Sequence, residues 1–324
     1  MAEKKQSLLA LLEILKQYSD EDHLLSIRDM QRHLKNGYGL DIERRTIYAH
    51  MDLLRQNGYE ISSYDESGKG YYLQGRQFDK GEVLLLCNAV HASHFISARQ
   101  SDQLVSKLLA TQSRYQQQEY RDKVYLANPL KTPNRQLLYT IEIVSEAIRD
   151  GRQLQFTYLK YDDRKKLVAR RQEPYIVEPR YIVYADSRAY MIVTSLKHPG
   201  FIHYRLDRMA DARILNEKVR KLPKETDAYE YARNKLFMYA GEMEHVTFSC
   251  KEEILDQMID IFGTDLPILS AEDGRFLIRV KTSQRGALFL AQQFLDSLSI
   301  VEPQDLKEEF RKQLQRVLHD YSIT

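Results

Sequence analysis

The 324-residue sequence lacks the short motifs on which several large enzyme classes depend. It has no glycine-rich loop followed by Lys and Ser or Thr, the arrangement that cradles a phosphate chain. It also has no GxSxG, HExxH or CxxC sequence, so it lacks the nucleophile elbow of α/β-hydrolases, the zinc-protease helix and the CxxC redox dithiol. We therefore expect a protein without enzymatic activity and without a cofactor.

Cysteine is scarce, with only Cys87 and Cys250 in the chain. The two lie far apart and lack the short spacing of a metal site, and their apolar neighbours favour buried structural thiols. The histidines are scattered. His91 and His94 are three residues apart on a predicted helix, but without a third ligand nearby we do not expect a metal site there.

Long apolar runs are also missing, because no segment approaches the roughly 18 residues that a membrane span needs. The N-terminus has no signal-peptide cleavage pattern, and its leucines are spaced as in a helix. A hydrophobic content of 43% with 29% charged residues is typical of a soluble globular protein, and the length allows two or three domains. These features predict a cytoplasmic protein without a membrane partner.

The charge is unevenly distributed, although the net charge is only +2. Residues 149–221 contain 17 Lys and Arg against 9 Asp and Glu, a net charge of +8. Residues 222–324 have a net charge of −6, residues 1–75 have −2 and residues 76–148 have +2. The basic excess predicts that an anionic partner binds the 149–221 segment.

The first 75 residues predict three helices followed by a hairpin. Apolar residues recur at three- and four-residue spacing over 5–19, 27–35 and 42–57, which indicates amphipathic helices. Short aromatic strands then flank a turn at 65–70. Helix, helix, helix, hairpin is the order of a winged helix-turn-helix, a fold that binds DNA.

The predicted helix ends rest on local signals. Ser26 is a typical N-cap and Asp29 stands at the third position of the second helix, which Asn36-Gly37 is expected to end. Asp41 is expected to cap the third helix.

The third helix has two distinct faces. Its inner face consists of Ile47, Met51 and Leu54, and the side chains that point the other way are Arg45, Tyr48, Ala49 and Asp52. Recognition helices place such N-terminal residues against base edges and phosphates. The candidate DNA-binding residues are Arg44, Arg45, Thr46, Tyr48 and Lys69. The alternative is a helix used only for protein contacts, which the net charge of −2 supports.

Residues 76–148 are predicted to be helical, with breaks at Pro129 and Pro133. The last helix, over 135–150, has an apolar side formed by Leu138, Ile141, Val144 and Ile148. We interpret this segment as a bridge between two domains, and it is one candidate for a dimer contact.

Short strands dominate residues 149–222. A first strand alternates Leu154, Phe156 and Tyr158, and a charged turn follows at 162–166. Three runs rich in Tyr, Ile and Val then form a meander over 176–209. In its last strand, one face carries Phe201, His203 and Arg205, and the other carries Ile202, Tyr204 and Leu206.

This meander resembles a known family on Pro179, Ala189-Tyr190-Met191 and the run YRLDRM at 204–209. The pattern is similar to the WYL domain, a ligand-sensing, Sm-like β-barrel of bacterial transcription regulators. Ala189 stands where the family has Trp, Met191 where it has Leu, and Ile202 where it often has Arg. The run RRTIY at 44–48 likewise resembles the recognition helix of these regulators.

The last hundred residues predict a β-α-β-β-α-β order, which is ferredoxin-like. This part resembles the WCX-type extension that follows WYL domains. The predicted fold class is therefore α+β and multidomain: a winged helix-turn-helix at 1–75, a helical bridge at 76–148, a WYL barrel at 149–222, and a ferredoxin-like domain at 223–324.

A ligand site is predicted on the barrel, where tyrosine rings can stack on a base and arginine forks can bind phosphate. The candidate residues are Tyr158, Arg180, Tyr190, His203, Arg205 and Arg208. In the alternative interpretation, the tyrosines belong to the core, Arg208 pairs with Asp207 or another acid, and the charges form a solvated rim.

Together these features predict a dimeric regulator that binds a pseudo-palindromic operator in double-stranded DNA. The resemblance implies a nucleic-acid fragment or a nucleotide as the anionic ligand. Two other classes remain open. One is an interaction protein whose barrel binds RNA or a partner protein, and the other is an accessory enzyme of DNA processing.

Overall fold

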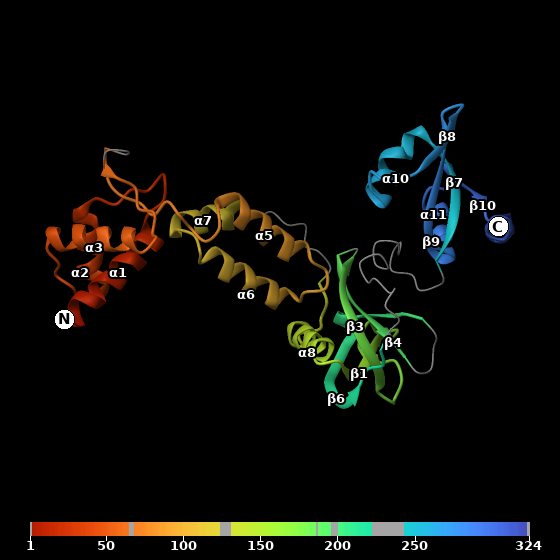
Figure 1. Cartoon of the computed structure of the whole chain (residues 1–324), viewed down its shortest axis with the longest axis horizontal. Coiled ribbons are helices and arrows are strands. Elements are labelled where there is room, and N and C mark those ends of the chain that lie inside the picture. The colour runs from red at the N-terminus through yellow and green to blue at the C-terminus, as the bar shows by residue number, and fades with distance from the viewer. Residues whose placement is uncertain are drawn as a thin grey trace. The chain divides into compact units, whose positions relative to one another are not determined.

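The structure is a computed structural model that describes residues 2–64, 68–123, 131–185, 187–195, 200–221 and 243–322. The chain divides into two compact units, Met1–Arg135 and Gln136–Thr324 (Figure 1). Every helix within the described ranges is too short or too polar to traverse a lipid bilayer.

Three helices open the first unit: α1 (Ala2–Tyr18), α2 (Ile27–Tyr38) and α3 (Arg44–Gln56). Their apolar faces meet in one core, whose fully buried side chains include Leu11, Leu15, Met30, Ile47 and Met51. The three helices predicted from apolar spacing are confirmed, because each places its apolar stripe in this core.

Helix α2 begins as predicted and ends later than predicted. The Asp29 N–H donates to the Ser26 hydroxyl at 3.2 Å, and the Ser26 N–H donates to the Asp29 carboxylate at 3.1 Å. The predicted end at Asn36-Gly37 is wrong, because the helix continues to Tyr38. Gly39 ends it with a φ of 68°, a left-handed conformation that favours glycine.

Helix α3 begins without a side-chain cap, so the cap predicted at Asp41 is wrong. The Asp41 carboxylate pairs with Lys35 Nζ at 3.0 Å instead. Glu43 occupies the N-cap position and makes no side-chain capping bond, and the first turn contains no acidic residue. The Thr46 N–H donates to the Glu43 carbonyl oxygen at 3.0 Å, and the start of α3 has no side-chain cap.

An antiparallel hairpin follows α3. Ile61 pairs with Leu73, and Tyr71 pairs with Leu25 from the connection between α1 and α2. Gly70 permits this approach, because a Cβ atom at that position would lie 2.8 Å from the Leu25 carbonyl oxygen. The hairpin is thereby fastened to the helical core.

Residues 80–123 are largely helical, as predicted. They form α5 (Lys80–Ala92), α6 (Ala98–Leu109) and α7 (Arg114–Lys123), with α5 and α6 packed together. Their small core contains Val83, Cys87, Leu109 and Tyr120. The predicted breaks at 128–129 lie outside the described residues.

The second unit opens with α8 (Leu137–Arg149), which precedes a six-stranded antiparallel sheet. The strands are β1 (Arg152–Tyr161), β2 (Leu167–Ala169), β3 (Tyr175–Ala185), β4 (Arg188–Thr194), β5 (Ile202–Arg205) and β6 (Met209–Lys218). Strand β1 pairs with β2, β3 and β6, and its pairing with β6 contains register shifts. Such irregularities bend strands, and the sheet is curled.

Helix α8 packs on this sheet, whereas the sequence assigned it to the preceding bridge. The predicted apolar side is also partly wrong. Val144 is buried as expected, but Leu138 is 37% exposed and the other buried positions are Leu137, Thr140 and Ala147. The face of α8 that packs on the sheet is displaced by about one residue from the predicted apolar stripe. This is possible because α8 has apolar residues around most of its circumference.

The C-terminal part contains a second antiparallel sheet, in the order β10-β7-β9-β8. Its elements are β7 (Met243–Lys251), α10 (Leu255–Phe262), β8 (Ile268–Glu272), β9 (Arg275–Ser283), α11 (Gln284–Gln293), β10 (Leu298–Glu302) and α12 (Gln304–Ser322). Phe248, Ile278 and Leu290 are fully buried in its core. In β9, buried Ile278 and Val280 alternate with exposed Arg279 and Lys281, so one face of the sheet is covered.

Candidate functional site

The outward side of α3 is the first candidate site. Arg45, Ala49 and Asp52 are exposed, as predicted, while Thr46 is half-buried. Within the described part of the chain, the Arg45 side chain has no hydrogen bond or ion pair. Its guanidinium fork is therefore available to an incoming group at the N-terminal end of the helix.

Arg44 is exposed and attached to Tyr48. Its Nη2 donates to the Tyr48 hydroxyl at 2.8 Å, and its guanidinium carbon lies 5.4 Å from the centre of the Tyr48 ring. This hydrogen bond raises the pKa of Arg44 and lowers the pKa of Tyr48. The pair holds a positive charge in a fixed place on the surface.

An aromatic row connects α3 to the hairpin. The ring centres of Tyr48 and Tyr71 are 6.3 Å apart, and those of Tyr71 and Tyr64 are 6.1 Å apart. Tyr64 is 52% exposed, and the sequence analysis missed it although it stands at the start of the predicted turn. Lys69 is also exposed, and residues 65–67 lie outside the described residues.

The second candidate site lies on β4 and β5. Tyr190 is directly opposite Arg205 across the two strands, and His203 lies two residues before Arg205 on the same face. The sequence prediction brought these three residues together, and the register confirms that they are neighbours. The Arg205 guanidinium donates to both Asp207 carboxylate oxygens, at 3.0 and 2.7 Å, and Asp207 is buried.

Tyr158 is half-buried and lies in an aromatic cluster. Its hydroxyl accepts a hydrogen bond from the Arg205 backbone N–H at 3.2 Å, and burial raises its pKa. Its ring centre is 5.0 Å from that of Tyr204 and 6.0 Å from that of Tyr175. Tyr158 therefore supports the backbone of the strand that carries Arg205.

Arg180, one of the predicted ligand residues, lies in a buried ion cluster. Its Nη2 is 3.1 Å from the Glu178 carboxylate, which also accepts hydrogen bonds from Arg220 and Thr194. The Glu178 side chain is 2% exposed. Burial alone would raise the pKa of Glu178, but the hydrogen bonds from Arg220 and Thr194 outweigh it and hold the pKa at about 2.

Two further arginines lie over tyrosine rings. The guanidinium carbon of Arg208 is 4.2 Å from the ring centre of Tyr161. The alternative interpretation paired Arg208 with Asp207 or another acid, but the residue that pairs with Asp207 is Arg205. Arg171 lies 3.6 Å from the ring centre of Tyr175. Arg171 is not among the predicted ligand residues, because only folding brings its side chain onto the tyrosine.

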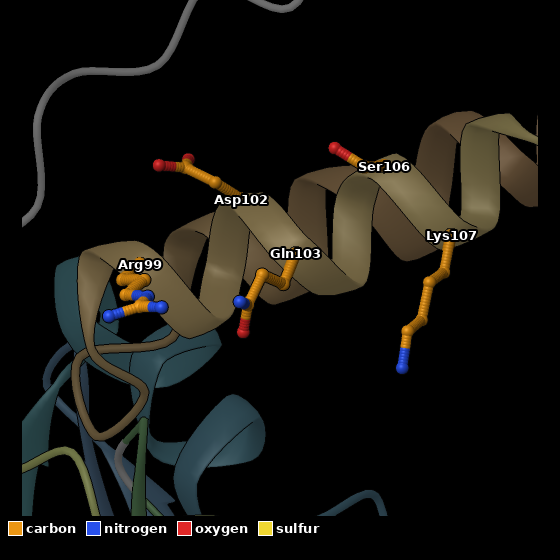
Figure 2. Close-up of a pocket in the computed structure, with 5 residues that line it drawn as sticks. All are labelled: Arg99, Asp102, Gln103, Ser106 and Lys107. Carbon is orange, nitrogen blue, oxygen red and sulfur yellow. The ribbon is translucent and has the colours of Figure 1, made fainter.

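A hollow along α6 has no features of a ligand site. Figure 2 shows its lining side chains, which are Arg99, Asp102, Gln103, Ser106 and Lys107. All of them project from one helix at three- and four-residue spacing, so they form an open surface and not an enclosed pocket. In the described ranges, no three His, Cys, Asp or Glu side chains are grouped as metal ligands.

The segment from α8 to β6 has a known sequence pattern. Residues 139–214 match the WYL domain. The match begins within α8 and ends within β6, so this WYL region includes all six predicted ligand residues. It also includes most of α8, the helix that packs on the curled sheet.

Two solved structures are similar to the chain. Proteasome accessory factor B/C (PafBC) of Arthrobacter aurescens is 16% identical with a TM-score of 0.28; the alignment covers 98% of this chain and 49% of that one, so our chain spans about half its length. The crystal structure of a CRISPR Cas-related protein is 12% identical with a TM-score of 0.37. That alignment covers 98% of this chain and 85% of the other chain. A comparison with curated proteins found no match.

Proposed function

We propose that the chain is a non-enzymatic, ligand-responsive transcription regulator that binds operator DNA as a dimer. Residues 1–75 act as a winged helix-turn-helix, 76–148 as a bridge, 149–222 as an Sm-like sensor barrel, and 223–324 as a ferredoxin-like, WCX-type domain. The observation that carries the proposal is the exposed, basic N-terminal end of α3, which has two arginines and no acid in its first turn.

This end of α3 suits the DNA backbone and the major groove. The unpaired N–H groups at a helix N-terminus carry partial positive charge, and Arg44 and Arg45 add two full charges beside them. Recognition helices enter the major groove with this end first. Tyr48 holds Arg44, which favours a phosphate contact, whereas Arg45 is free to reach a guanine edge.

We therefore expect Arg45→Ala to weaken binding to the specific operator by about 1–3 kcal/mol and to leave the fold intact. Arg44→Ala should lower the affinity for specific and scrambled duplexes alike, because a phosphate contact carries no sequence information. Gel-shift titrations of both variants on both duplexes measure this. Arg99→Ala on α6 is the matched control, and an Arg45→Ala variant with unchanged operator affinity would contradict the recognition-helix assignment.

The WYL region supports the sensing part of the proposal. Residues 149–221 have a net charge of +8, which attracts an anion such as a nucleotide or a nucleic-acid fragment. At Tyr190, His203 and Arg205, the guanidinium already has a partner in Asp207. An anionic ligand would have to compete with Asp207 for Arg205, so binding would rearrange an ion pair in this sheet and shift the populations of the dimer.

A second function is an interaction protein whose barrel binds RNA or another protein. The net charge of −2 over residues 1–75 favours it, because most DNA-binding domains are basic. The two functions differ in one measurement: only the regulator retards a discrete duplex against excess competitor DNA.

A further inference from the structure

Arg76 connects two helices that lie far apart in the sequence. It follows the hairpin and precedes α5. Its guanidinium donates to the carbonyl oxygens of Lys16 at 3.0 Å and of Ser19 at the end of α1, and to the Thr111 carbonyl oxygen, beyond the end of α6, at 3.3 Å. Carbonyl groups in the last turn of a helix, such as that of Lys16, have no partner within the helix and carry partial negative charge. One guanidinium therefore caps α1 and joins it to the turn that follows α6.

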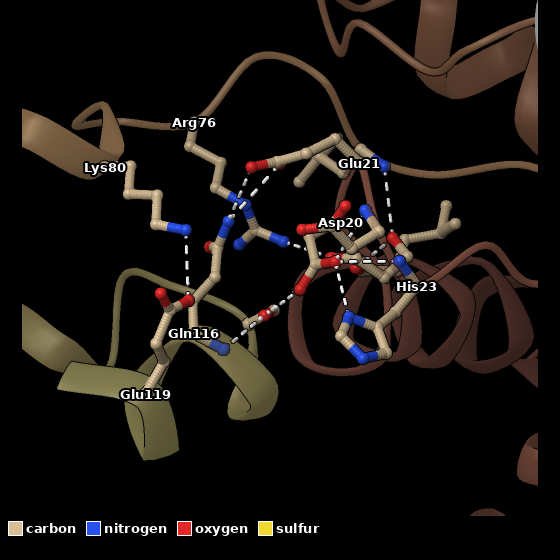
Figure 3. A network of polar contacts seen from close by, with 12 residues as sticks. Asp20, Glu21, His23, Arg76, Lys80, Gln116 and Glu119 are labelled. Atoms are coloured by element: carbon tan, nitrogen blue, oxygen red, sulfur yellow. Dashed lines mark hydrogen bonds and ion pairs between the residues drawn. The ribbon is translucent and has the colours of Figure 1, made fainter. Parts of the chain in front are cut away.

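We call these contacts of Arg76, together with those of the buried Asp20 carboxylate, the joint. Asp20 is 1% exposed, and one of its oxygens accepts a hydrogen bond from the Ser113 hydroxyl, just before α7. Its other oxygen accepts bonds from the His23 N–H at 2.8 Å and from the Asp22 N–H at 3.1 Å, and lies 2.7 Å from His23 Nδ1. Figure 3 shows Asp20 and Arg76 within the same network.

Helix α7 adds an outer layer to the joint. The Gln116 side chain donates to the Glu21 carboxylate at 3.3 Å, and the rings of His23 and Tyr115 stack with centres 3.8 Å apart and planes 4° from parallel. Glu119, also on α7, pairs with Lys80 of α5 at 3.0 Å. The Gln116 and Tyr115 contacts join the segment 19–23 to α7, and the Lys80–Glu119 pair joins α5 to α7 (Figure 3).

Such a joint resists partial opening. Separating α1 from α6 leaves the Arg76 guanidinium without its carbonyl partners, and separating α7 from the 19–23 segment leaves the Asp20 carboxylate without the Ser113 hydroxyl. Buried charges and hydrogen-bonding groups that lose partners without gaining water are costly. The joint is therefore either closed or fully separated, whereas the 74–79 connection alone would allow a range of orientations.

We infer that Arg76 is a positioning residue that locks α1–α3 onto α5–α7, so that the bridge determines the orientation of the DNA-binding face of α3. The consequence for DNA rests on the proposed function. In a dimer, the two α3 helices meet half-sites at a set spacing only if each is held rigidly by its bridge. Loosening the joint should remove the preference for one spacing and leave the contacts of α3 within each half-site unchanged.

The lock is tested by a distance measurement on the full chain. Spin labels are placed on Gln56→Cys of α3 and Lys107→Cys of α6, both exposed positions. The native thiols Cys87 and Cys250 are buried, so they do not compete for the label. Labelled chain is diluted with excess unlabelled chain, so that only distances within one chain contribute. We expect a narrow distance distribution in the otherwise unchanged chain and a broad one in Arg76→Met.

Matched variants separate the lock from general instability. Arg99→Met removes an exposed arginine from α6 and should keep the narrow distribution. Ser113→Ala removes the hydroxyl that donates to Asp20 and that also accepts from the Gln116 backbone N–H at 3.1 Å, and it should broaden the distribution even if Arg76→Met does not fold. A narrow distribution in both Ser113→Ala and a folded Arg76→Met would overturn the lock.

Gel shifts on duplexes with varied half-site spacing test the consequence. We expect Arg76→Met to bind all spacings alike, while Arg99→Met keeps the preference. If no duplex is retarded by the unaltered chain, the proposed function fails, but the distance distributions still decide the lock. If the distributions broaden and the spacing preference persists, the lock exists and its role in positioning α3 is wrong.

Discussion

Several charged side chains of the WYL region form ion pairs, and Glu178 pairs with two arginines. Its carboxylate accepts from Arg180, Arg220 and Thr194, and its pKa is about 2, against an ordinary value of 4.5. A carboxyl with a lowered folded-state pKa stabilises the fold above its unfolded pKa, and this contribution is lost as the pH falls through the folded pKa. The stabilisation is therefore present above pH 4.5 and disappears towards pH 2.

We expect Glu178→Gln to destabilise the chain at pH 7 by roughly 3 kcal/mol at most, as a shift of this size implies. The difference from the unaltered chain should shrink as the pH falls from 4.5 towards 2, because both proteins then carry an uncharged side chain at position 178. Urea unfolding at pH 7, 5 and 3 measures the difference. Glu173→Gln, an exposed position, is the control, and a pH-independent difference for Glu178→Gln would contradict the assigned pKa.

Sequence reasoning at this scale identified which residues gather, but not their partners. Tyr190, His203 and Arg205 are neighbours because strand alternation and the register of β4 on β5 place them on one face. That Asp207 pairs with Arg205 and not with Arg208 depends on the 3₁₀ turn at Leu206–Arg208. This turn redirects the chain between β5 and β6, and alternation does not anticipate it.

Among the elements, the hairpin of the first unit depends on one glycine. A Cβ atom at Gly70 would lie 2.8 Å from the Leu25 carbonyl oxygen and 2.9 Å from its carbon, and both are backbone atoms that cannot move aside cheaply. Gly70→Ala should destabilise the first unit and displace the hairpin. Gly37→Ala, inside α2 with no atom within 4 Å, should instead stabilise it by about 0.5–1 kcal/mol.

Thermal unfolding of the two alanine variants measures this contrast, since both add the same methyl group to the same unit. A Gly70→Ala variant as stable as the unaltered chain would show that the close approach of the hairpin to Leu25 is not required.

Local signals predicted elements better than their ends or faces. Ser26 with Asp29 caps α2 because both partners lie within one turn. Asp41 resembles a cap in the sequence, but Lys35 is near enough to take its carboxylate. The buried side of α8 is set by the sheet beneath it, and Leu138 is consequently exposed despite its place in the apolar stripe.

For the whole molecule, we expect a dimer in solution. One α3 helix offers few base contacts, and two half-sites about one helical turn apart would double them. Light scattering with and without operator DNA measures the assembly, and a monomer at micromolar concentration in both cases would count against it. Leu85 on α5 is 70% exposed and Leu318 on α12 is 69% exposed. Replacing each by Asp tests which of the two helices forms the contact.

The response to ligand also belongs to the whole molecule. Arg205→Glu should abolish the effect of an anionic ligand on DNA binding but keep the dimer, because it removes the positive fork from β5. Asp207→Asn should have the opposite effect and tighten binding, since it weakens the competitor for Arg205. Fluorescence anisotropy with short single-stranded oligonucleotides, at rising salt, measures both. Equal affinities in the unaltered chain and Arg205→Glu would place the ligand on another face.

The sequence by itself determined the helices of the first unit, the strands of the WYL region and the concentration of positive charge in it. Those features depend on apolar spacing, turn residues and composition, which act over a few neighbouring positions. Tertiary structure alone decided that α8 packs on the curled sheet, that Glu178 collects Arg180 and Arg220, and that Arg76 joins α1 to α6. Each of these contacts joins groups many residues apart, and no local pattern specifies which distant carbonyl or carboxylate an arginine will reach.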